Sequence, residues 1–434
     1  MSAAAPAPAW RRSLSIFSAR SCALVWLAAS TSLPAHALDL AEAERIAVER
    51  DAMLRQLAAE AQGMRERAVA EGQLMDPKLR LGAVNVPVDS FSLDAEDMTM
   101  LEVGVSQEFQ GGRTRELARK RMEQSAVAAE AVAADRRLVV QREVRRAWTE
   151  LAYVARARQL VEGQAEWVEQ MRASARARYA SGEGRQLDVL QAGLDVAMLR
   201  EQLLDLDRDE AMRRAQLGRW IGDDRARLAN ATALPARASL EPLATLEERL
   251  LRHPAQQDFE RRIAAAETAT DLARQRNRPS WMLDVSYGFR DGEMIGGESR
   301  PDMLSAMVSF DLPLFRANRQ DREVAAARAE TRALHEMHDD HQREMLAMLA
   351  EAWSVADRTA ALERFYETDL LPLAEQSVQA ALLAYGANRS MIDDVIAARR
   401  TALETRLKHL RLAADRAQAQ YDVDYLAGGA GHEQ

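Results

Sequence analysis

The stretch YASGEGRQLDVLQA at residues 179–192 returns later in the same chain as YGANRSMIDDVIAA at residues 385–398. The two copies align without a gap. Identical pairs mark the alignment, among them Tyr179 with Tyr385, Asp188 with Asp394, and Ala192 with Ala398. Self-similarity at a fixed distance indicates an internal repeat. A protein built from two copies of one unit is therefore the first prediction.

The duplication extends upstream of these stretches. Pro77–Leu81 matches Pro279–Leu283, and Trp148 matches Trp353 within one residue. Each copy has the same order of features: a helix, two strands, a very long helix, a turn and a long returning helix. The predicted organisation is a first repeat at residues 38–222, a linker at 223–238, a second repeat at 239–428 and a tail at 429–434.

Very long helices dominate the prediction. The first should begin near Thr114 and run to about Tyr179, on the order of 100 Å at 1.5 Å per residue. Apolar residues recur along it at alternating steps of three and four, the spacing of a coiled-coil seam. A soluble coiled-coil scaffold would show the same spacing. The seams contain Val140, Val144, Ala147, Leu151, Val154, Val161, Ala165, Val168, Ala175 and Tyr179, and, in the last helix, Leu403, Leu407, Leu410, Ala414, Ala417 and Tyr421.

The predicted strands alternate between apolar and polar residues. Stretches of about ten residues with one apolar and one polar face are what a membrane barrel strand needs, although a soluble sheet can alternate too. Four strands cannot close a barrel, and open edges are costly in lipid, so two or three chains would have to share one. The apolar positions are Leu79, Leu81, Ala83, Leu101, Val103, Val105 and Phe109 in the first half, and Trp281, Leu283, Val285, Tyr287, Phe289, Leu304, Ala306, Val308 and Phe310 in the second.

Residues 1–37 are expected to be an export signal. Arginines precede a short apolar core at Cys22–Ala29, and Ala35-His36-Ala37 forms a small-residue cleavage site before Leu38. Cys22 is the only cysteine, so no disulfide or thiolate ligand is expected after cleavage. Arg20 argues against a lipid anchor at Cys22. The net charge of -9 argues against nucleic acid as a partner.

These features resemble the TolC-type outer-membrane efflux family over nearly the whole mature chain. The most specific parts are the element at Tyr179 and the run Val308–Phe315, where the last strand turns into a long helix. The resemblance implies a mainly α fold with a small β part. Three chains would form a coiled-coil α-barrel continuous with a shared membrane β-barrel of about twelve strands, following the closed-barrel rule.

The run Ser106–Arg113, with its Gly-Gly-basic ending, resembles the heavy-metal cation-efflux branch of that family. The resemblance implies a homotrimer in the outer membrane with a large periplasmic part. Its partners would be lipid, a periplasmic adaptor of the membrane-fusion type and an inner-membrane pump of the RND type. Passive conduction of heavy-metal cations is the expected function. Drug efflux, type I protein secretion and an exported periplasmic scaffold remain the alternatives.

An enzyme is the class that the residues favour least. The sequence has no nucleotide-binding glycine loop and no recognisable catalytic triad, and we expect no cofactor. One metal-like cluster, His335, His338 and Asp339, would share a helix face. A solvated polar face explains it as well, so it is a weak metal candidate.

The two repeated turns are the predicted functional sites. Asp188 and Asp394 follow equivalent turns, and rings of these acids at the periplasmic end would attract cations and form a gate, supported by Tyr179 and Tyr385. The alternative is that they are helix-start acids that favour the helix dipole. The resemblance further implies that the tips of the turns dock the adaptor, at Gly182, Gly184, Gly386 and Asn388.

Overall fold

The structure is a computed structural model that describes residues 38–234, 239–387 and 389–429. The expected export signal, Asn388 and residues 430–434 of the tail lie outside this range. The first half contains α1 (Leu40–Arg50), α2 (Ala52–Glu71), β1 (Lys78–Val84), β2 (Met100–Phe109), α3 (Thr114–Ala180) and α4 (Gln186–Ile221). The second contains α5 (Asp223–Leu228), α6 (Leu243–Leu250), α7 (Pro254–Gln275), β3 (Trp281–Phe289), β4 (Met303–Phe310), η1 (Arg316–Asn318), α8 (Gln320–Phe365), η2 (Tyr366–Leu370), α9 (Leu371–Gly386) and α10 (Ile392–Leu426).

The prediction of a mainly α fold with one strand pair in each half is confirmed. The first long helix, α3, starts and ends within one residue of its predicted limits. The short helix α5 occupies part of the segment predicted as a linker. No helix among the described residues is both long enough and apolar enough to cross a membrane.

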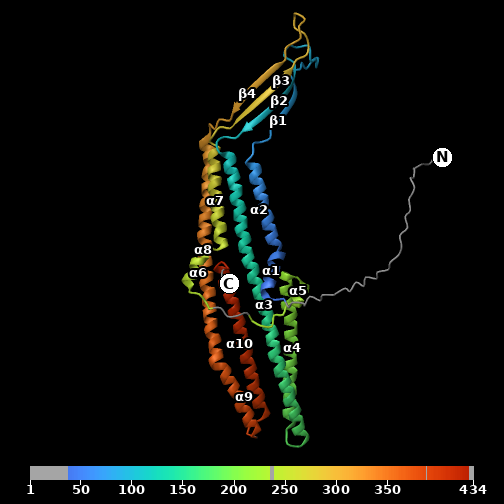
Figure 1. Cartoon of the computed structure of the whole chain (residues 1–434), viewed down its shortest axis with the longest axis vertical. Coiled ribbons are helices and arrows are strands. Elements are labelled where there is room, and N and C mark those ends of the chain that lie inside the picture. The colour runs from blue at the N-terminus through green and yellow to red at the C-terminus, as the bar shows by residue number, and fades with distance from the viewer. Residues whose placement is uncertain (1–37, 235–238, 388, 430–434) are drawn as a thin grey trace, which may run out of the picture. The chain divides into compact units, whose positions relative to one another are not determined.

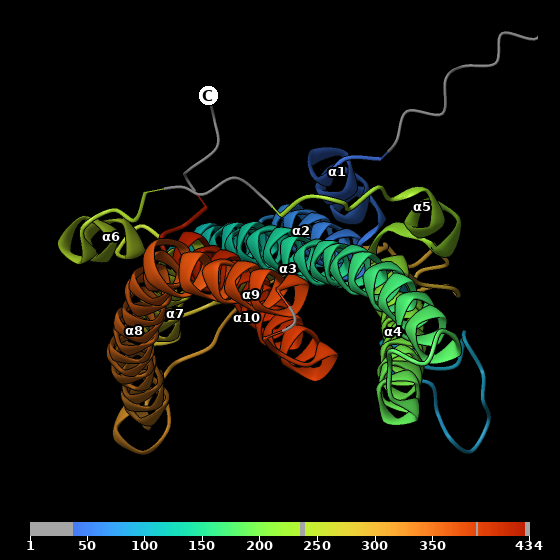
Figure 2. The ribbon, with the colours of Figure 1, turned by 90° about the horizontal axis from the view of Figure 1, so that it is seen from below.

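The helices of residues 38–429 pack side by side in a curved layer, with the sheet at one end and the turns α3–α4 and α9–α10 at the other (Figures 1 and 2). Two apolar clusters hold the middle of this layer. Leu151, Leu217 and Ile221 belong to the first, between α3 and α4. Leu349, Leu250 and Leu426 belong to the second, between α8, α6 and α10. Each cluster thus joins the long helix of one half to the end of its returning helix.

The four strands form one antiparallel sheet in the order β1-β2-β3-β4. The register places Val105 opposite both Leu79 and Val285, and Val285 opposite Ala306. Because side chains alternate between faces along a strand, this register collects the predicted apolar residues of all four strands on one face. Among the described residues, β1 and β4 have no partner strand beyond them, so both edges of the sheet are open.

A sharp bend separates the first two helices in each half, and one side chain holds each bend. Asp51 has an extended backbone between α1 and α2, and its carboxylate accepts a hydrogen bond of 2.8 Å from the amide of Leu54. His253 does the same before α7, where its Nδ1 accepts from the amide of Ala255 at 3.1 Å. Asp and His thus cap equivalent helices, since a side-chain acceptor satisfies a free amide at the helix start.

Asp51 also binds α3. Nη2 of Arg136 lies 2.8 Å from Oδ2 of Asp51, whose side chain is 7% exposed. Burial raises the pKa of Asp51, but the hydrogen bonds from Arg136 and from the amide of Leu54 outweigh burial, and the net pKa is lowered. Because its pKa is lower in the folded protein than in the unfolded chain, Asp51 stabilises the fold at pH values above its unfolded-state pKa. This stabilisation is lost as the pH falls through its folded-state pKa.

We expect Asp51→Asn to lower the free energy of unfolding by about 1–2 kcal/mol at pH 7. Asn caps a helix about as well as Asp does, so the loss reports the ion pair with Arg136. The difference from the native protein should shrink as the pH falls below the ordinary aspartate pKa of 3.8, because the carboxylate of the unfolded chain takes up a proton first and that of the folded protein follows at its lower pKa. Thermal unfolding of the native protein and of the variant, followed by circular dichroism at several pH values, measures this difference in stability. A difference that does not change with pH would contradict the assignment.

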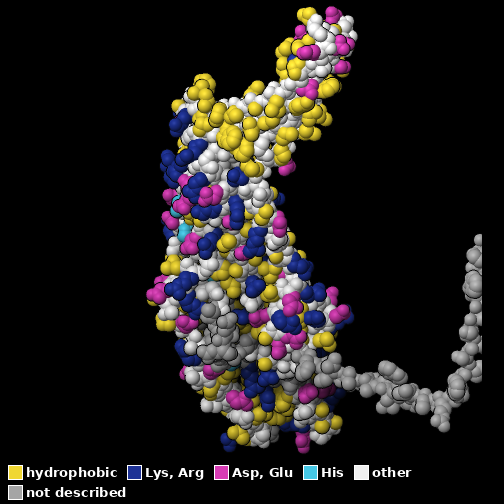
Figure 3. Space-filling model, turned by 45° about the horizontal axis from the view of Figure 1, so that its top comes forward, with side chains coloured by type: hydrophobic (Ala, Val, Ile, Leu, Met, Phe, Trp, Pro, Cys, Tyr) yellow, Lys and Arg dark blue, Asp and Glu magenta, His cyan; other side chains and the backbone are white. Residues whose placement is uncertain are grey.

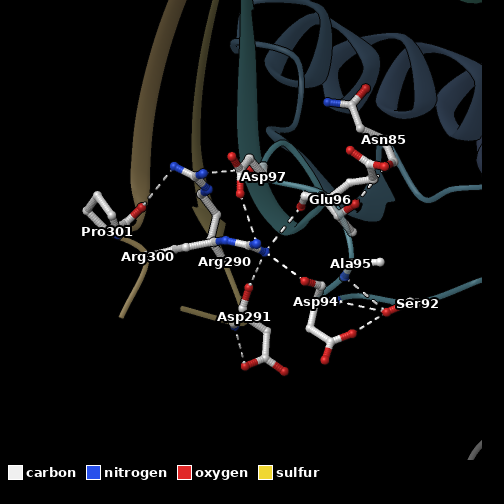
Figure 4. A network of polar contacts seen from close by, with 12 residues as sticks. Asn85, Ser92, Asp94, Ala95, Glu96, Asp97, Arg290, Asp291, Arg300 and Pro301 are labelled. Atoms are coloured by element: carbon white, nitrogen blue, oxygen red, sulfur yellow. Dashed lines mark hydrogen bonds and ion pairs between the residues drawn. The ribbon is translucent and has the colours of Figure 1, made fainter. Parts of the chain in front are cut away.

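The two loops at the far end of the sheet are fastened together by two arginines (Figure 4). Nη1 of Arg300 donates to the carbonyls of Asp94 (3.0 Å), Glu96 (3.3 Å) and Asp291 (3.0 Å). Arg290, which lies in the same β3–β4 loop as Arg300, donates to the carbonyl of Asp97 in the β1–β2 loop. Backbone carbonyls thus replace water around the guanidinium of Arg300, which ties the β1–β2 loop to the β3–β4 loop.

Candidate functional site

The apolar face of the sheet is exposed across all four strands. Leu81 on β1 is 69% exposed and Leu304 on β4 is 75% exposed, although the strands themselves are regular. Apolar side chains cover the lower part of the sheet in Figure 3. Contiguous apolar surface of this extent marks an interaction with lipid or with another protein. The exposed members are Leu79, Leu81, Leu101, Val103, Val105, Trp281, Val285, Tyr287, Phe289, Leu304, Val308 and Phe310.

The opposite face of the sheet carries charges that bind one another. Nη2 of Arg80 lies 2.7 Å from Oε1 of Glu102 and 2.9 Å from Oδ1 of Asp284. Gly104 stands opposite both Arg80 and Ser286 in the register. A Cβ at Gly104 would lie 3.0 Å from Cβ of Ser286 and 3.4 Å from Nη2 of Arg80. The glycine therefore leaves the space that the arginine side chain occupies. This face can line a water-filled passage.

The turn between α3 and α4 depends on two of the predicted glycines. Gly182 has φ of +81°, a backbone conformation that favours glycine. A Cβ at Gly184 would lie 2.9 Å from the amide nitrogen of Tyr179, so this residue is needed for close approach of the backbone. Gly386, the last residue of α9, has open space where a Cβ would be. Asn388 lies outside the described residues.

The two predicted gate acids each close the first turn of their own helix. Oδ2 of Asp394 accepts from the amide of Met391 at 3.0 Å. Oδ2 of Asp188 accepts from the amide of Arg185 at 3.4 Å, and its Oδ1 accepts from Nη2 of that arginine at 2.7 Å. The helix-start interpretation therefore describes their contacts within one chain. A ring of these acids requires further copies and remains a prediction.

The two turns of the chain contact each other. Nη1 of Arg178, on α3, donates to the hydroxyl of Tyr385, on α9, at 2.9 Å. Nη2 of Arg185 lies 3.0 Å from the sulfur of Met391. A small apolar cluster beneath these contacts contains Ala175, Ala192, Ile392 and Ile396. These contacts join the helical hairpin of the first half to that of the second. Tyr385 takes part in this connection through its hydroxyl, whereas the side chain of Tyr179 is half exposed.

Arg178 was not among the residues predicted from the sequence. Its position one residue before Tyr179 gives no signal, because the second copy has Ala384 at the matching place. The polar partner of Tyr385 therefore comes from the other repeat and depends on how α3 packs against α9. Duplication alone cannot reveal a contact that breaks the symmetry between the copies.

The predicted metal cluster is spread out in the structure. The ring of His338 stacks on Phe259 of α7 at 5.7 Å between centroids, and His335 and Asp339 are exposed. Among the described residues, one group of three His, Asp or Glu side chains brings its ligand atoms within 4.8 Å of one another. That group is Glu363, Glu367 and His409, which the sequence did not single out.

The Gly-Gly-basic run after β2 has a local structural reason. Gly112 has φ of +64°, and a Cβ at Gly111 would lie 2.5 Å from the carbonyl oxygen of Pro279. Both glycines are therefore needed where β2 turns into α3 against the segment before β3. The run does not by itself identify a substrate.

Several solved structures have the same fold as this chain. The outer membrane protein VceC of Vibrio cholerae is 18% identical, with a TM-score of 0.74 over 90% of this chain and 96% of VceC. The outer membrane channel CmeC of Campylobacter jejuni is 13% identical, with a TM-score of 0.73 over 96% of this chain and 94% of CmeC. CusC, whose structures concern transmembrane channel formation, is 15% identical, with a TM-score of 0.72 over 90% of this chain and 92% of CusC.

No family model matches the sequence, and no curated protein matches it. The likeness to the solved structures is therefore one of fold, and it spans nearly the whole length on both sides. The predicted resemblance to TolC-type channels is confirmed at that level.

Proposed function

From the TolC-type fold of this chain, we propose that it is the outer-membrane channel of a tripartite efflux system and conducts its substrates passively. The observation that carries the proposal is the sheet, which has one exposed apolar face, one polar face and two open edges. In lipid, the backbone groups of an open edge have no water to bind, which costs several kcal/mol for each group. Further copies of the chain would satisfy β1 and β4 and enclose the polar face.

The long helices support assembly from several copies. Leu187, Leu190, Leu194 and Met198 recur along α4 at steps of three and four, and each is at least half exposed. A stripe with this spacing is the seam of a helix that packs on another helix. Three chains of four strands would give the closed barrel that the resemblance implies. The helices would then continue the passage through the periplasm.

We expect three chains in each particle when the protein is extracted in detergent from outer membranes. Mass photometry of the purified particle measures the number of chains, and separation of inner and outer membranes measures the location. A detergent-free monomer in the periplasmic fraction would contradict the channel. It would favour the exported coiled-coil scaffold instead.

The turns at the end remote from the sheet are the proposed docking surface for a periplasmic adaptor that connects the channel to an inner-membrane pump. Gly386 offers a clean test, because a Cβ added there would have open space around it among the described residues. We expect Gly386→Trp to abolish cross-linking to the adaptor while the yield of trimer stays normal. Gly163→Trp, which adds the same bulk at an open position within α3, is the control. Docking lies elsewhere if both variants cross-link like the native protein.

Heavy-metal cations are the proposed cargo, on the resemblance of Ser106–Arg113 to the cation-efflux branch. The polar face of the sheet and the two acids at the turns would suit cations. A deletion strain should become sensitive to zinc, cobalt or cadmium and regain resistance with the native gene. Unchanged metal resistance together with new sensitivity to dyes or detergents would assign the channel to drug efflux.

A further inference from the structure

The long helix of the second half changes its winding at a site where ionisable side chains gather. α8 ends at Phe365, and η2 continues it as a single π-helical turn, in which the amide of Leu371 bonds to the carbonyl of Tyr366. Pro372 follows directly and cannot donate a backbone hydrogen bond, which widens or kinks a helix before it. Such π-bulges occur frequently at functional sites. α10 runs beside this step in Figure 1.

Three potential metal ligands converge at this step. Glu363 and Glu367 both contact α10, where Glu363 pairs with Arg416 and Glu367 pairs with His409. One ligand atom from each residue lies within 4.8 Å of the other two. We propose that Glu363, Glu367 and His409 form a binding site for a divalent transition-metal ion of the Zn²⁺ class. The site is in the helical wall and is distinct from the sheet and the turns.

The spacing of the atoms fits such an ion. Nε2 of His409 lies 3.3 Å from Oε1 of Glu367, which is long for a hydrogen bond between nitrogen and oxygen. In a tetrahedral zinc site with bonds of about 2.0–2.1 Å, neighbouring ligand atoms are about 3.4 Å apart. His409 and Glu367 already have this separation. Glu367 is partly exposed, and its ligand atom already lies within 4.8 Å of that of Glu363.

The surroundings of Glu363 also suit a cation. Its side chain is 1% exposed, and Nη1 of Arg416 lies 2.9 Å from its Oε2. A partner that holds one oxygen of a ligating carboxylate fixes its orientation, as supporting groups do at metal sites. Glu363 and Glu367 supply two carboxylates to the cluster, and the guanidinium of Arg416 offsets part of their negative charge. An imidazole ligand favours zinc, copper or nickel over calcium and magnesium, which prefer oxygen ligands.

The test uses the full-length protein in detergent, purified with an affinity tag that contains no histidine and stripped with EDTA. We expect isothermal titration with ZnCl₂ to show one ion bound to each chain, and we expect no comparable binding of MgCl₂. Bound Zn²⁺ should raise the thermal unfolding midpoint, because a ligand that binds only the folded state stabilises it.

Glu367→Gln and His409→Asn should each weaken Zn²⁺ binding by at least about tenfold, whereas His335→Asn, on an exposed helix face, should leave it unchanged. These two ligand positions are partly exposed, so the variants should fold even if Glu363→Gln does not. Absence of Zn²⁺ binding to the native protein, or binding that survives in both variants, would overturn the site and leave an ordinary hydrogen bond between His409 and Glu367. Neither result depends on conduction, so the proposed channel would stand.

Discussion

Val285→Asp should remove nearly all of the trimer from the outer membrane. Val285 stands at the centre of the apolar face, between Val105 and Ala306 in the register, and in a closed barrel it would face lipid. A carboxylate near the middle of the bilayer costs on the order of 1–2 kcal/mol. The cost is repeated in each of three chains, so assembly loses about 5 kcal/mol in total by that rule. The amount of heat-resistant trimer in outer-membrane fractions measures the effect.

Ser305→Asp is the matched control for this prediction. It adds the same charge to the neighbouring strand β4, but Ser305 pairs with Ser286 on the polar face. In a water-filled passage the added carboxylate remains hydrated, so trimer yield should stay close to normal. Equal yields for the two variants would show that the apolar face does not meet lipid.

The faces of the sheet could be predicted because strands have a period of two. Once Trp281, Val285 and Phe289 are placed on one face, every second residue of the strand must share that face, and Asp284 and Ser286 must lie on the other. The length of α3 was predictable for a similar reason, since its apolar residues keep the coiled-coil spacing and no proline interrupts the helix before the turn. The first copy has Asp51-Ala52 where the second has His253-Pro254, so the sequence alone does not show that the two bends are equivalent. The structure shows that both residues supply the same cap.

The contacts between distant helices could not be predicted in the same way. Arg178 on α3 contacts Tyr385 on α9, and Glu363 on α8 contacts Arg416 on α10. Both contacts depend on how far along its length each helix lies against its neighbour. Neither pair has a fixed sequence spacing, and neither is repeated in the other half of the chain. The π-helical step before Pro372 shifts the facing of the residues around it, and a regular helical pattern does not include that shift. The periodicity of a sequence predicts which face of a helix or strand a residue lies on, whereas these two contacts depend on how the helices pack against one another.

The turns should determine how strongly the channel attracts cations. If three chains assemble with their turns together, two acids from each chain would place six carboxylates around the passage. Within about 8 Å, each carboxylate should attract a trivalent cation by on the order of 0.5 kcal/mol after screening by physiological salt. The double variant Asp188→Asn/Asp394→Asn should therefore weaken block by a trivalent cation at least tenfold. Single-channel recording in planar bilayers measures both the block and the conductance.

Asparagine is the informative substitution, because each acid also accepts an amide hydrogen bond at its own helix start. Asn keeps one acceptor oxygen for the amide at the helix start and replaces the other oxygen with an uncharged NH₂ group. The charge and, at Asp188, the ion pair with Arg185 are lost, whereas the amide hydrogen bonds should still hold the turns in place. Tyr385→Phe provides the opposite comparison. It removes the hydroxyl that Arg178 binds and leaves every carboxylate in place, so we expect higher conductance with the cation block retained. If the trivalent cation blocks the Asp188→Asn/Asp394→Asn channel as strongly as the native one, the two acids act only as helix-start residues. The contact between Arg178 and Tyr385 then remains as the part of the turns that can hold the passage closed.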